Sequence, residues 1–202
     1  MKEKGSTKMI EGISLFLSGI EEEMSLPEGS LLQDKNLVAT PHRVTSMFLE
    51  LLNGYSEDPG SLLDTTWEGP TESDSLVIIS DIDLVSVCAH HLAIFRGVVH
   101  VGYIPSRGRI VGLSKIVRVV EAFAHRLQLQ EVLTEQIAST IDTVLTPQGV
   151  IVVISASHDC MRVRGVHSRN SITITSAVRG LFLSDPGVKA EFFSLLNKGG
   201  NQ

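Results

Sequence analysis

The stretch "SLVIISDIDLVSVCAHHLAIFRGVVHVGYI", residues 75–104, combines two strand-like runs with a compact group of metal-ligating side chains. Both ends are rich in β-branched residues, a composition that predicts two β-strands. Cys88, His90 and His91 lie where the first of these strands ends. Because thiols and imidazoles are preferred zinc ligands, this segment is a candidate part of a metal site.

Two helices are expected after this pair of strands. The first runs from Ser114 to about Leu127, with Ser114 as its cap and an apolar stripe along one side. The second runs from about Gln130 to Leu145 and has a similar stripe. The segment "GRIVGL", residues 108–113, precedes the first helix and is expected to continue the sheet.

Two further strands are expected after the helices. The segment "GVIVVISAS", residues 149–157, predicts a strand buried on both faces. The segment "NSITITSAV", residues 170–178, alternates in polarity and predicts a strand with one wet face. A short helix around residues 188–196 completes the pattern. Runs of strands with two consecutive helices between them predict an α+β fold with an antiparallel sheet.

The residues before the sheet are predicted to be mostly helical. A helical alternation covers Thr7 to Met24, and a second helix is expected to start with Thr40 as its cap and to end at Gly54. Residues 55–74 are polar and turn-rich, which predicts a long loop or linker. The expected domains are a helical region with its linker, residues 1–73, and a second domain, residues 74–202.

Composition narrows the classes of function. The chain has 202 residues and a formal net charge of −6, which argues against a nucleic-acid binder that relies on a broad basic surface. No apolar run approaches the length that spans a membrane, and the early apolar stretch suits an amphipathic helix better than a signal peptide. Two cysteines without an export signal predict a cytoplasmic protein with reduced thiols. The alternative interpretation of these cysteines is a pair of buried, inert thiols.

A second group of metal-ligating residues, His158 and Cys160, lies just after the first strand that follows the helices. Cys88 and His91 are three residues apart, a spacing that lets one turn of chain offer both to one ion. With Cys160 they would give three protein ligands and an open fourth position, the pattern of catalytic zinc. Spacing alone leaves the choice between His90 and His91 open. The other histidine, together with His158, would carry protons.

Cationic side chains are grouped at the start of the first helix after the strands. Lys115 and Arg118 are three residues apart and share a face of this helix, where cations oppose the helix dipole. They could therefore hold a phosphate chain, and a solvated surface is the alternative. Arg162 and Arg164 would point the same way if their segment were extended.

Glu131 lies near the start of the second helix, where a carboxylate suits the helix dipole. A carboxylate can also accept from the N1–H and 2-amino groups of a guanine, which are two adjacent donors. Both interpretations of Glu131 stay open at this point.

These segments, in this order, resemble those of the GTP cyclohydrolase I family. The resemblance runs from "TPHR" at Thr40 through "CAHHL", "HVGYIP", "GLSKIVRVVEAFAHRLQLQEVLTEQIA", "SHDCMRVRGV" and "TITS" to "EFFSLL". It covers roughly the last four-fifths of the chain, and motifs of this length are specific.

The resemblance implies the tunnelling fold, in which an antiparallel four-stranded sheet carries two antiparallel helices on one face after N-terminal helices. Residues 74–202 would be the tunnelling-fold catalytic domain. A ring-stacked homodecamer with sites at subunit interfaces is also implied, with zinc as the cofactor and GTP as the substrate. The implied reaction converts GTP and water to 7,8-dihydroneopterin triphosphate and formate, the first step of tetrahydrofolate and pterin biosynthesis.

The motif matches imply a role for each of twelve residues. Cys88, His91 and Cys160 match the zinc ligands, and His90 and His158 match the catalytic histidines. The positions that match substrate contacts are Gln130 and Glu131 for the guanine, and Ser114, Lys115, Arg118, Arg164 and Arg43 for the ribose and triphosphate.

Three positions depart from the family pattern. Ala89 replaces a glutamate, Val132 replaces an arginine, and Asp159 replaces a bulky apolar or aromatic residue. Ala89 removes a carboxylate near one metal ligand and Asp159 adds one near another, so the two changes could compensate.

The expected function is that of an active GTP cyclohydrolase I. One alternative is a divergent paralogue that acts on a related purine nucleotide or stops at a ring-opened intermediate. Another is a nucleotide-binding regulatory member with little turnover. A zinc nucleoside deaminase is disfavoured, because its His-x-Glu and Pro-Cys-x-x-Cys pattern is absent.

Overall fold

The computed structural model describes residues 2–69 and 75–199. The chain divides into two compact units, Met1–Leu51 and Leu52–Gln202. The first is helical and the second is α+β. Within the described residues, no helix combines the length and apolar character that crossing a membrane requires. The start of a catalytic domain at residue 74 stays a prediction.

The first unit contains the two expected helices. α1 spans Lys2–Glu23 and begins earlier than expected, whereas α2 spans Thr40–Leu51 and ends before the glycine that was expected to stop it. The segment between them returns to the end of α1. There the Glu21 carboxylate accepts hydrogen bonds from the backbone N–H groups of Gly29 and Leu31, at 3.0 and 2.6 Å.

The second unit is built on a five-stranded sheet in the order β5-β2-β3-β6-β7. Its strands are β2 (Val77–Cys88), β3 (Ile94–Ile104), β5 (Leu127–Gln128), β6 (Gly149–His158) and β7 (Thr173–Gly180). Neighbouring strands are antiparallel, except that β5 runs parallel to β2. The four expected strands are therefore present, and β5 adds a two-residue edge. Leu127, which was expected to end a helix, lies in this edge strand instead. The short helix α5 (Asp159–Arg162) follows β6 directly.

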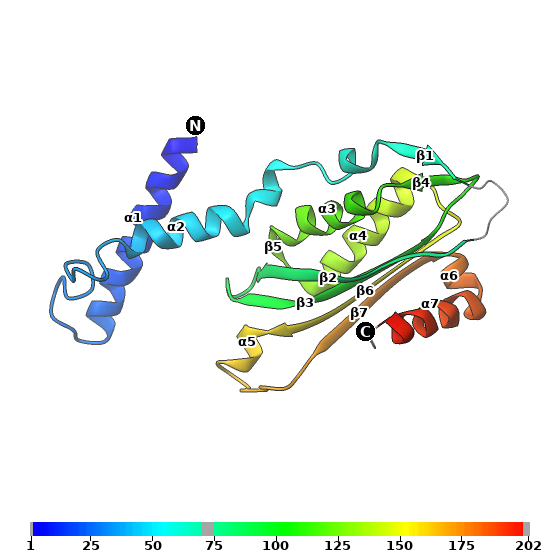
Figure 1. Ribbon diagram of the computed structural model, residues 1–202. Helices are drawn as coiled ribbons and strands as arrows, with labels where there is room; N and C mark the ends of the chain where they lie inside the picture. Colours follow the sequence, from blue (N-terminus) through cyan, green and yellow to red (C-terminus); the bar gives the residue numbers. More distant parts are fainter. Residues whose placement is uncertain (1, 70–74, 200–202) are drawn as a thin grey trace. The chain divides into compact units, whose positions relative to one another are not determined.

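Two helices lie side by side on one face of the sheet (Figure 1). α3 spans Leu113–Ala124, and α4 spans Gln130–Leu145, as expected. Their apolar stripes meet the strands in the main core, where Phe95, Val120 and Ile137 are fully buried. The α+β architecture with two helices on one face of the sheet is therefore confirmed.

The ends of α3 differ from the sequence-based expectation. Gly112 occupies the N-cap position, so Ser114 lies inside the first turn and is not the cap. At the other end, Arg126 Nε donates to the carbonyl oxygens of Ala122 and Gly54, at 3.0 and 3.1 Å. Because a side chain satisfies a carbonyl of the last turn, the chain can leave the helix early and form β5.

The opposite face of the sheet carries α6 (Leu181–Ser184) and α7 (Pro186–Gly199), which is longer than the expected C-terminal helix (Figure 1). Phe192 is fully buried in a second, smaller core on this side. Successive residues of β6 alternate between the two cores, with Val152 in the main core and Ile151 in the second. The prediction that this strand is buried on both faces is confirmed.

Residues 52–69 contain short regular elements where a long loop was expected. These are η1 (Asn53–Ser56), η2 (Ser61–Leu63) and β1 (Thr66–Glu68). Leu63 is 1% exposed and belongs to the main core. β1 pairs with β4 (Arg109–Val111) in a separate two-stranded sheet, so "GRIVGL" does not continue the main sheet as expected. The turn before β4 has positive φ at Arg107 and Gly108, which directs the chain away from β3. The last residues of the expected loop lie outside the described residues.

Candidate active site

A pocket of about 340 Å³ opens where β2 and β6 end beside the start of α4. Its walls come from segments that lie far apart in the sequence. The lining residues are Cys88, His90, His91, Gln128, Leu129, Gln130, Glu131, His158, Cys160, Met161 and Thr173. The pocket therefore brings together the predicted metal ligands, both predicted catalytic histidines and the predicted guanine-binding pair.

Cys88, His91 and Cys160 converge in this pocket. Their ligand atoms all lie within 4.8 Å of one another, and Cys88 Sγ is 3.9 Å from His91 Nδ1. β2 ends at Cys88, and the chain turns at once, so that the N–H groups of His91 and Leu92 donate to the Cys88 carbonyl at 3.3 and 2.9 Å. This turn places His91 beside Cys88. Cys160 comes from the helical turn α5 rather than from an extended strand.

The donor set fits a zinc ion. Two thiols and an imidazole are side chains that zinc prefers, and three protein ligands leave a fourth position open. Burial and the nearby Cys88 raise the pKa of the Cys160 thiol, because a thiolate there is poorly solvated and faces a second sulfur. A divalent cation between the two sulfurs would remove this obstacle to ionisation.

His158 is held in one orientation at the pocket wall. Its ring stacks on Phe95, with the ring centroids 4.7 Å apart and the planes 10° from parallel. Its Nε2 lies 2.7 Å from Gln130 Oε1. Burial lowers the pKa of His158, and the Glu131 carboxylate opposes that shift. The pocket therefore favours the neutral imidazole.

Gln130 is 1% exposed, and both hydrogens of its amide point at oxygens of the chain. Its Nε2 lies 3.1 Å from the Ile154 carbonyl, 3.0 Å from the Thr173 carbonyl and 3.1 Å from Thr175 Oγ1. Because these oxygens accept, Oε1 must be the atom that faces His158, and an amide oxygen can only accept. His158 Nε2 therefore donates, which leaves Nδ1 as the acceptor of the neutral ring.

Glu131 and His90 lie at the same pocket with exposed side chains. Glu131 is in the first turn of α4, directly after Gln130. The His90 ring is edge-on to that of His91, with the centroids 6.1 Å apart. The side chains of Glu131 and His90 are therefore accessible to a bound ligand, whereas the Gln130 amide bonds to groups of the chain behind the pocket surface.

The predicted phosphate contacts on α3 are not among the residues that line this pocket. Ser114, Lys115 and Arg118 occupy the first two turns of α3, whereas Cys88 pairs with Gln128 beyond its last turn. At about 1.5 Å per residue, the axial distance from Ser114 to the end of α3 is about 15 Å. Within a single copy of the chain, these three residues therefore lie apart from the predicted metal ligands.

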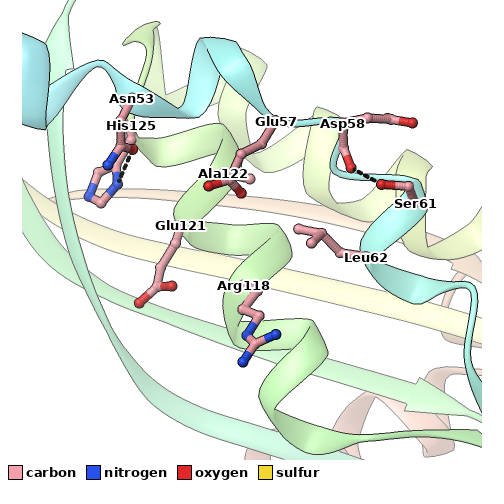
Figure 2. A pocket seen from close by; sticks show the side chains of 9 residues that line it. All are labelled: Asn53, Glu57, Asp58, Ser61, Leu62, Arg118, Glu121, Ala122 and His125. Atoms are coloured by element: carbon pink, nitrogen blue, oxygen red, sulfur yellow. Dashed lines mark hydrogen bonds between the residues drawn. The ribbon is translucent and has the colours of Figure 1, made fainter.

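Arg118 instead lines a different cavity, of about 560 Å³, along α3 (Figure 2). Glu57, Asp58 and Glu121 contribute carboxylates to the same cavity, together with the ring of His125. This predominance of acidic groups does not suit a phosphate chain, so the cavity does not complete a triphosphate site within one chain.

The basic residues after Cys160 lie differently from expectation. Because residues 159–162 form a helical turn, Arg162 and Arg164 do not project together from an extended strand. Arg162 Nη1 donates to Ser157 Oγ at 2.9 Å. Arg164 is exposed, and its positive charge opposes the rise in the pKa of Cys160, which places it near the site. Arg43 is exposed on α2, in the first unit.

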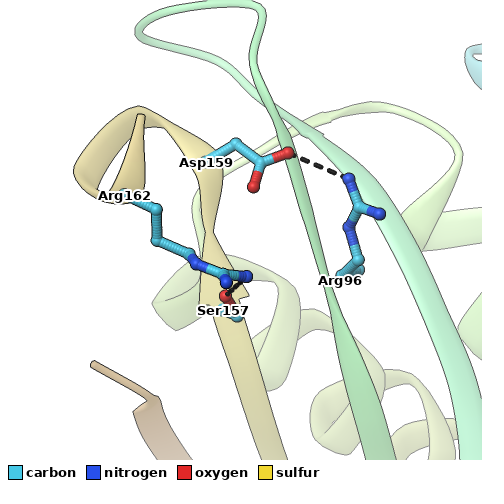
Figure 3. Close-up of polar contacts among 4 residues, drawn as sticks. All are labelled: Arg96, Ser157, Asp159 and Arg162. Atoms are coloured by element: carbon cyan, nitrogen blue, oxygen red, sulfur yellow. Dashed lines mark hydrogen bonds and ion pairs between the residues drawn. The ribbon is translucent and has the colours of Figure 1, made fainter. Parts of the chain in front are cut away.

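The three departures from the family pattern have distinct surroundings. Ala89 is exposed, and its backbone N–H donates to the Gln128 carbonyl at 2.9 Å. Val132 is 44% exposed on α4. Asp159 Oδ2 lies 2.9 Å from Arg96 Nη2 on β3 (Figure 3). The carboxylate that this chain adds beside Cys160 is therefore paired with an arginine, which sequence reasoning did not identify.

Comparisons with known proteins identify relatives of this chain. Residues 24–197 match the model of the GTP cyclohydrolase I family. A GTP cyclohydrolase 1 of Pelotomaculum thermopropionicum is 47% identical over 189 residues, covering 94% of this chain and 95% of the relative. A GTP cyclohydrolase 1 of Chlorobium chlorochromatii is 50% identical over 167 residues, covering 82% and 74%. The crystal structure of the archaeosine synthase QueF-Like in the apo form aligns with a TM-score of 0.45 and 22% identity, over 54% of this chain and 97% of that one. With a family match over most of its length and relatives at about half identity, this chain belongs to the GTP cyclohydrolase I family.

Proposed function

We propose that this protein converts GTP and water to 7,8-dihydroneopterin triphosphate and formate in a zinc-dependent reaction. The observation that carries the proposal is the convergence of Cys88, His91 and Cys160 in one pocket with His158 and Glu131. Family membership supports GTP as the substrate. The net reaction consumes one water, and C8 of the guanine leaves as formate.

Cys88, His91 and Cys160 would hold the zinc ion. When bound there, zinc would act as a Lewis acid. It would lower the pKa of a water molecule, so that hydroxide is available to attack C8 at neutral pH. The Cys160 thiol suits this role, because burial and the nearby Cys88 raise its pKa and a bound cation would offset the charge of its thiolate.

His158 is the proposed proton carrier inside the pocket. Gln130 holds the Nε2–H group, so Nδ1 is the atom that can take up a proton and return it. The lowered pKa of His158 keeps the ring neutral, and so able to accept a proton, near neutral pH. The exposed His90 is proposed as a second carrier at the pocket mouth.

Glu131 is proposed to anchor the guanine through its N1–H and 2-amino groups. Its carboxylate is exposed at the pocket and lies directly after the buried Gln130. With the base anchored at one end and the triphosphate at the other, C8 would be fixed for attack. The direct contact of Gln130 with guanine stays a prediction, because its amide is engaged by the chain.

The triphosphate contacts are proposed to come partly from a second copy of the chain. Ser114 lies about 15 Å along the helix from the end of α3 that adjoins the pocket, and Arg118 lies about 9 Å from that end. A homo-oligomer, proposed as a decamer from the family resemblance, would place the start of α3 of one copy at the pocket of another. Arg164 and Arg43 are proposed as further basic contacts to the substrate.

A divergent paralogue that stops at a ring-opened intermediate is the second candidate. Ala89 and Asp159 favour it, because each directly adjoins a proposed metal ligand and departs from the family pattern.

We place either activity in the cytoplasm, at the start of tetrahydrofolate and pterin synthesis. Cys88 and Cys160 are both free thiols, and a reducing compartment would keep them available to zinc.

Zinc-loaded protein incubated with GTP tests the proposal. Release of formate together with pterin fluorescence is expected. Loss of purine absorbance without pterin would favour the paralogue, and tight GTP binding without either change would indicate a regulatory binding protein. The same assay with Ala89→Glu would show whether that departure limits turnover.

A further inference from the structure

The α5 turn that carries Cys160 is fastened to the sheet on both sides of this residue (Figure 3). Asp159, directly before Cys160, pairs with Arg96 of β3 at 2.9 Å. Arg162, two residues after it, donates to Ser157 of β6 at 2.9 Å. The proposed metal ligand therefore lies between two side-chain anchors.

Both anchors attach to the face of the sheet that lies opposite the pocket. Arg96 and Ser157 are cross-strand partners on β3 and β6, and so are the preceding and following residues, Phe95 and His158. Successive side chains of a strand point to opposite faces. Phe95 belongs to the main core and stacks with His158, so Arg96 and Ser157 project from the other face. The anchors do not line the pocket, and the backbone of α5 is their mechanical link to the metal site.

The turn is short and lies at the end of a strand. α5 has four residues; the Val163 N–H donates to the Asp159 carbonyl at 3.1 Å, and the Ser168 N–H donates to the Met161 carbonyl at 2.9 Å. Its Cys160 must meet Cys88 and His91, which are carried by the end of another strand, within 4.8 Å. A small displacement of α5 along the sheet would separate the ligands.

We propose that the Arg96–Asp159 ion pair is a clamp that positions Cys160 for metal binding. The inference rests on the proposed zinc site and concerns two residues that do not line the pocket. Arg96 is 60% exposed and Asp159 is 26% exposed, so the pair is partly screened by water and its effect is modest.

Single and exchanged variants test the clamp. Arg96→Met keeps the aliphatic stem and removes the charge, Asp159→Ala removes the carboxylate, and the double variant Arg96→Asp with Asp159→Arg reverses the pair. The matched control is Arg179→Met, which breaks the Arg179–Glu135 ion pair between β7 and α4 and leaves α5 untouched. Circular dichroism would verify that each variant folds.

Two measurements separate the clamp from the proposed function. The first is the zinc dissociation constant, from competition with a chromophoric chelator. The second is the alkylation rate of Cys160 in metal-free protein, located by peptide mass spectrometry with Cys88 as the internal reference. The second measurement needs neither zinc nor turnover.

Each single variant is expected to weaken zinc binding about two- to fivefold, the range typical of a partly exposed ion pair. Cys160 alkylation is expected to accelerate relative to Cys88, the exchanged pair to recover part of both effects, and the control to change neither. Wild-type values in both single variants would overturn the clamp. So would tighter zinc binding in Asp159→Ala alone, because the carboxylate would then act by repelling the thiolate. If the wild type bound no zinc, the proposed metal site would be wrong, and the alkylation rates would still decide on the clamp.

Discussion

His158 Nε2 lies 2.7 Å from Gln130 Oε1, and Gln130 is itself fixed by the carbonyl oxygens of Ile154 and Thr173. The buried amide therefore determines which nitrogen of the histidine carries its proton. A further layer stabilises this arrangement, because Thr175 Oγ1 lies 3.1 Å from Gln130 Nε2. The buried Gln130 therefore orients His158, which is the proposed proton carrier of the pocket.

Gln130→Met is expected to reduce turnover about tenfold to a hundredfold, because His158 loses the contact that fixes its orientation. The variant also removes the buried hydrogen bonds from Nε2 to the Ile154 and Thr173 carbonyls, so unfolding is expected to become easier by about 1–3 kcal/mol. Turnover at saturating GTP and chemical denaturation measure the two effects. Gln148→Met is the matched control, since it loses a bond to the Pro105 carbonyl away from the pocket. If the control lost as much turnover, reduced stability would explain the effect and the role of Gln130 would be wrong.

Cys160→Ala is expected to lose bound metal and to lower turnover about a thousandfold or more, because the proposed ion would supply several kcal/mol of transition-state stabilisation. Metal content by elemental analysis and formate release are the measurements. Wild-type protein stripped with a chelator should lose activity in parallel and regain it when zinc is added back. A Cys160→Ala variant that retained both metal and turnover would refute the ligand assignment.

The parts of the fold that could be predicted from sequence depend on local pattern. The helix at Gln130–Leu145 was predicted with its observed bounds. Its apolar stripe is regular, and the first turn of the helix contains an acidic residue, Glu131. The strand predicted at residues 149–157 as buried on both faces is observed at Gly149–His158, and it was recognisable because its apolar run is continuous. In contrast, Leu127 was assigned to a helix by periodicity, although its pairing with Val87 places it in a strand. That pairing is a long-range contact, which periodicity does not contain.

In the candidate site, too, local features could be predicted from sequence and long-range contacts could not. Cys88 and Cys160 could be selected by their chemistry, because the chain has two cysteines, whereas the choice of His91 over His90 came from the family resemblance. The Arg96–Asp159 pair could not, because it joins residues separated by 63 positions and depends on the register of β3 against β6. The second cavity along α3 also could not be predicted, since it requires η1 and η2 to pack beside that helix.

Glu131→Gln is expected to raise the KM for GTP about tenfold to a hundredfold, because a charge-assisted pair of hydrogen bonds to guanine is replaced by a mismatched amide. Folding should change by no more than about 0.5 kcal/mol, since the side chain is exposed. Steady-state kinetics with GTP measure the effect. Glu135→Gln, one turn further along α4 and exposed, is the control for the loss of one negative charge. An unchanged KM would show that Glu131 does not bind the guanine and only stabilises the start of α4.

Glu21→Gln is expected to weaken the dependence of stability on pH in the acid range. Backbone N–H groups of Leu31 and Gly29 donate to the Glu21 carboxylate and lower its pKa below the usual range. A carboxyl with a lowered pKa stabilises the folded state fully above its ordinary pKa, and this contribution disappears as the pH falls through the folded-state value. Far-UV circular dichroism during acid titration is the measurement. Glu22→Gln, whose side chain is exposed, should leave the acid limb as in the wild type. The same curve for both variants would contradict the expectation.

Lys115→Ala and Cys160→Ala are expected to complement each other if one active site uses parts of two copies. Each variant alone should be inactive or nearly so, since one lacks a proposed triphosphate contact and the other a proposed metal ligand. In oligomers assembled from an equal mixture, a site needs Cys160 from one copy and Lys115 from another, so about a quarter of the sites would be intact. Turnover after co-refolding, compared with the separately refolded variants, measures this recovery. A mixture of Cys88→Ala with Cys160→Ala is the control, because both residues lie in one pocket of one chain, and it should recover nothing. Recovery in the control but not in the first mixture would show that the metal ligands, and not the cationic residues of α3, are shared between copies.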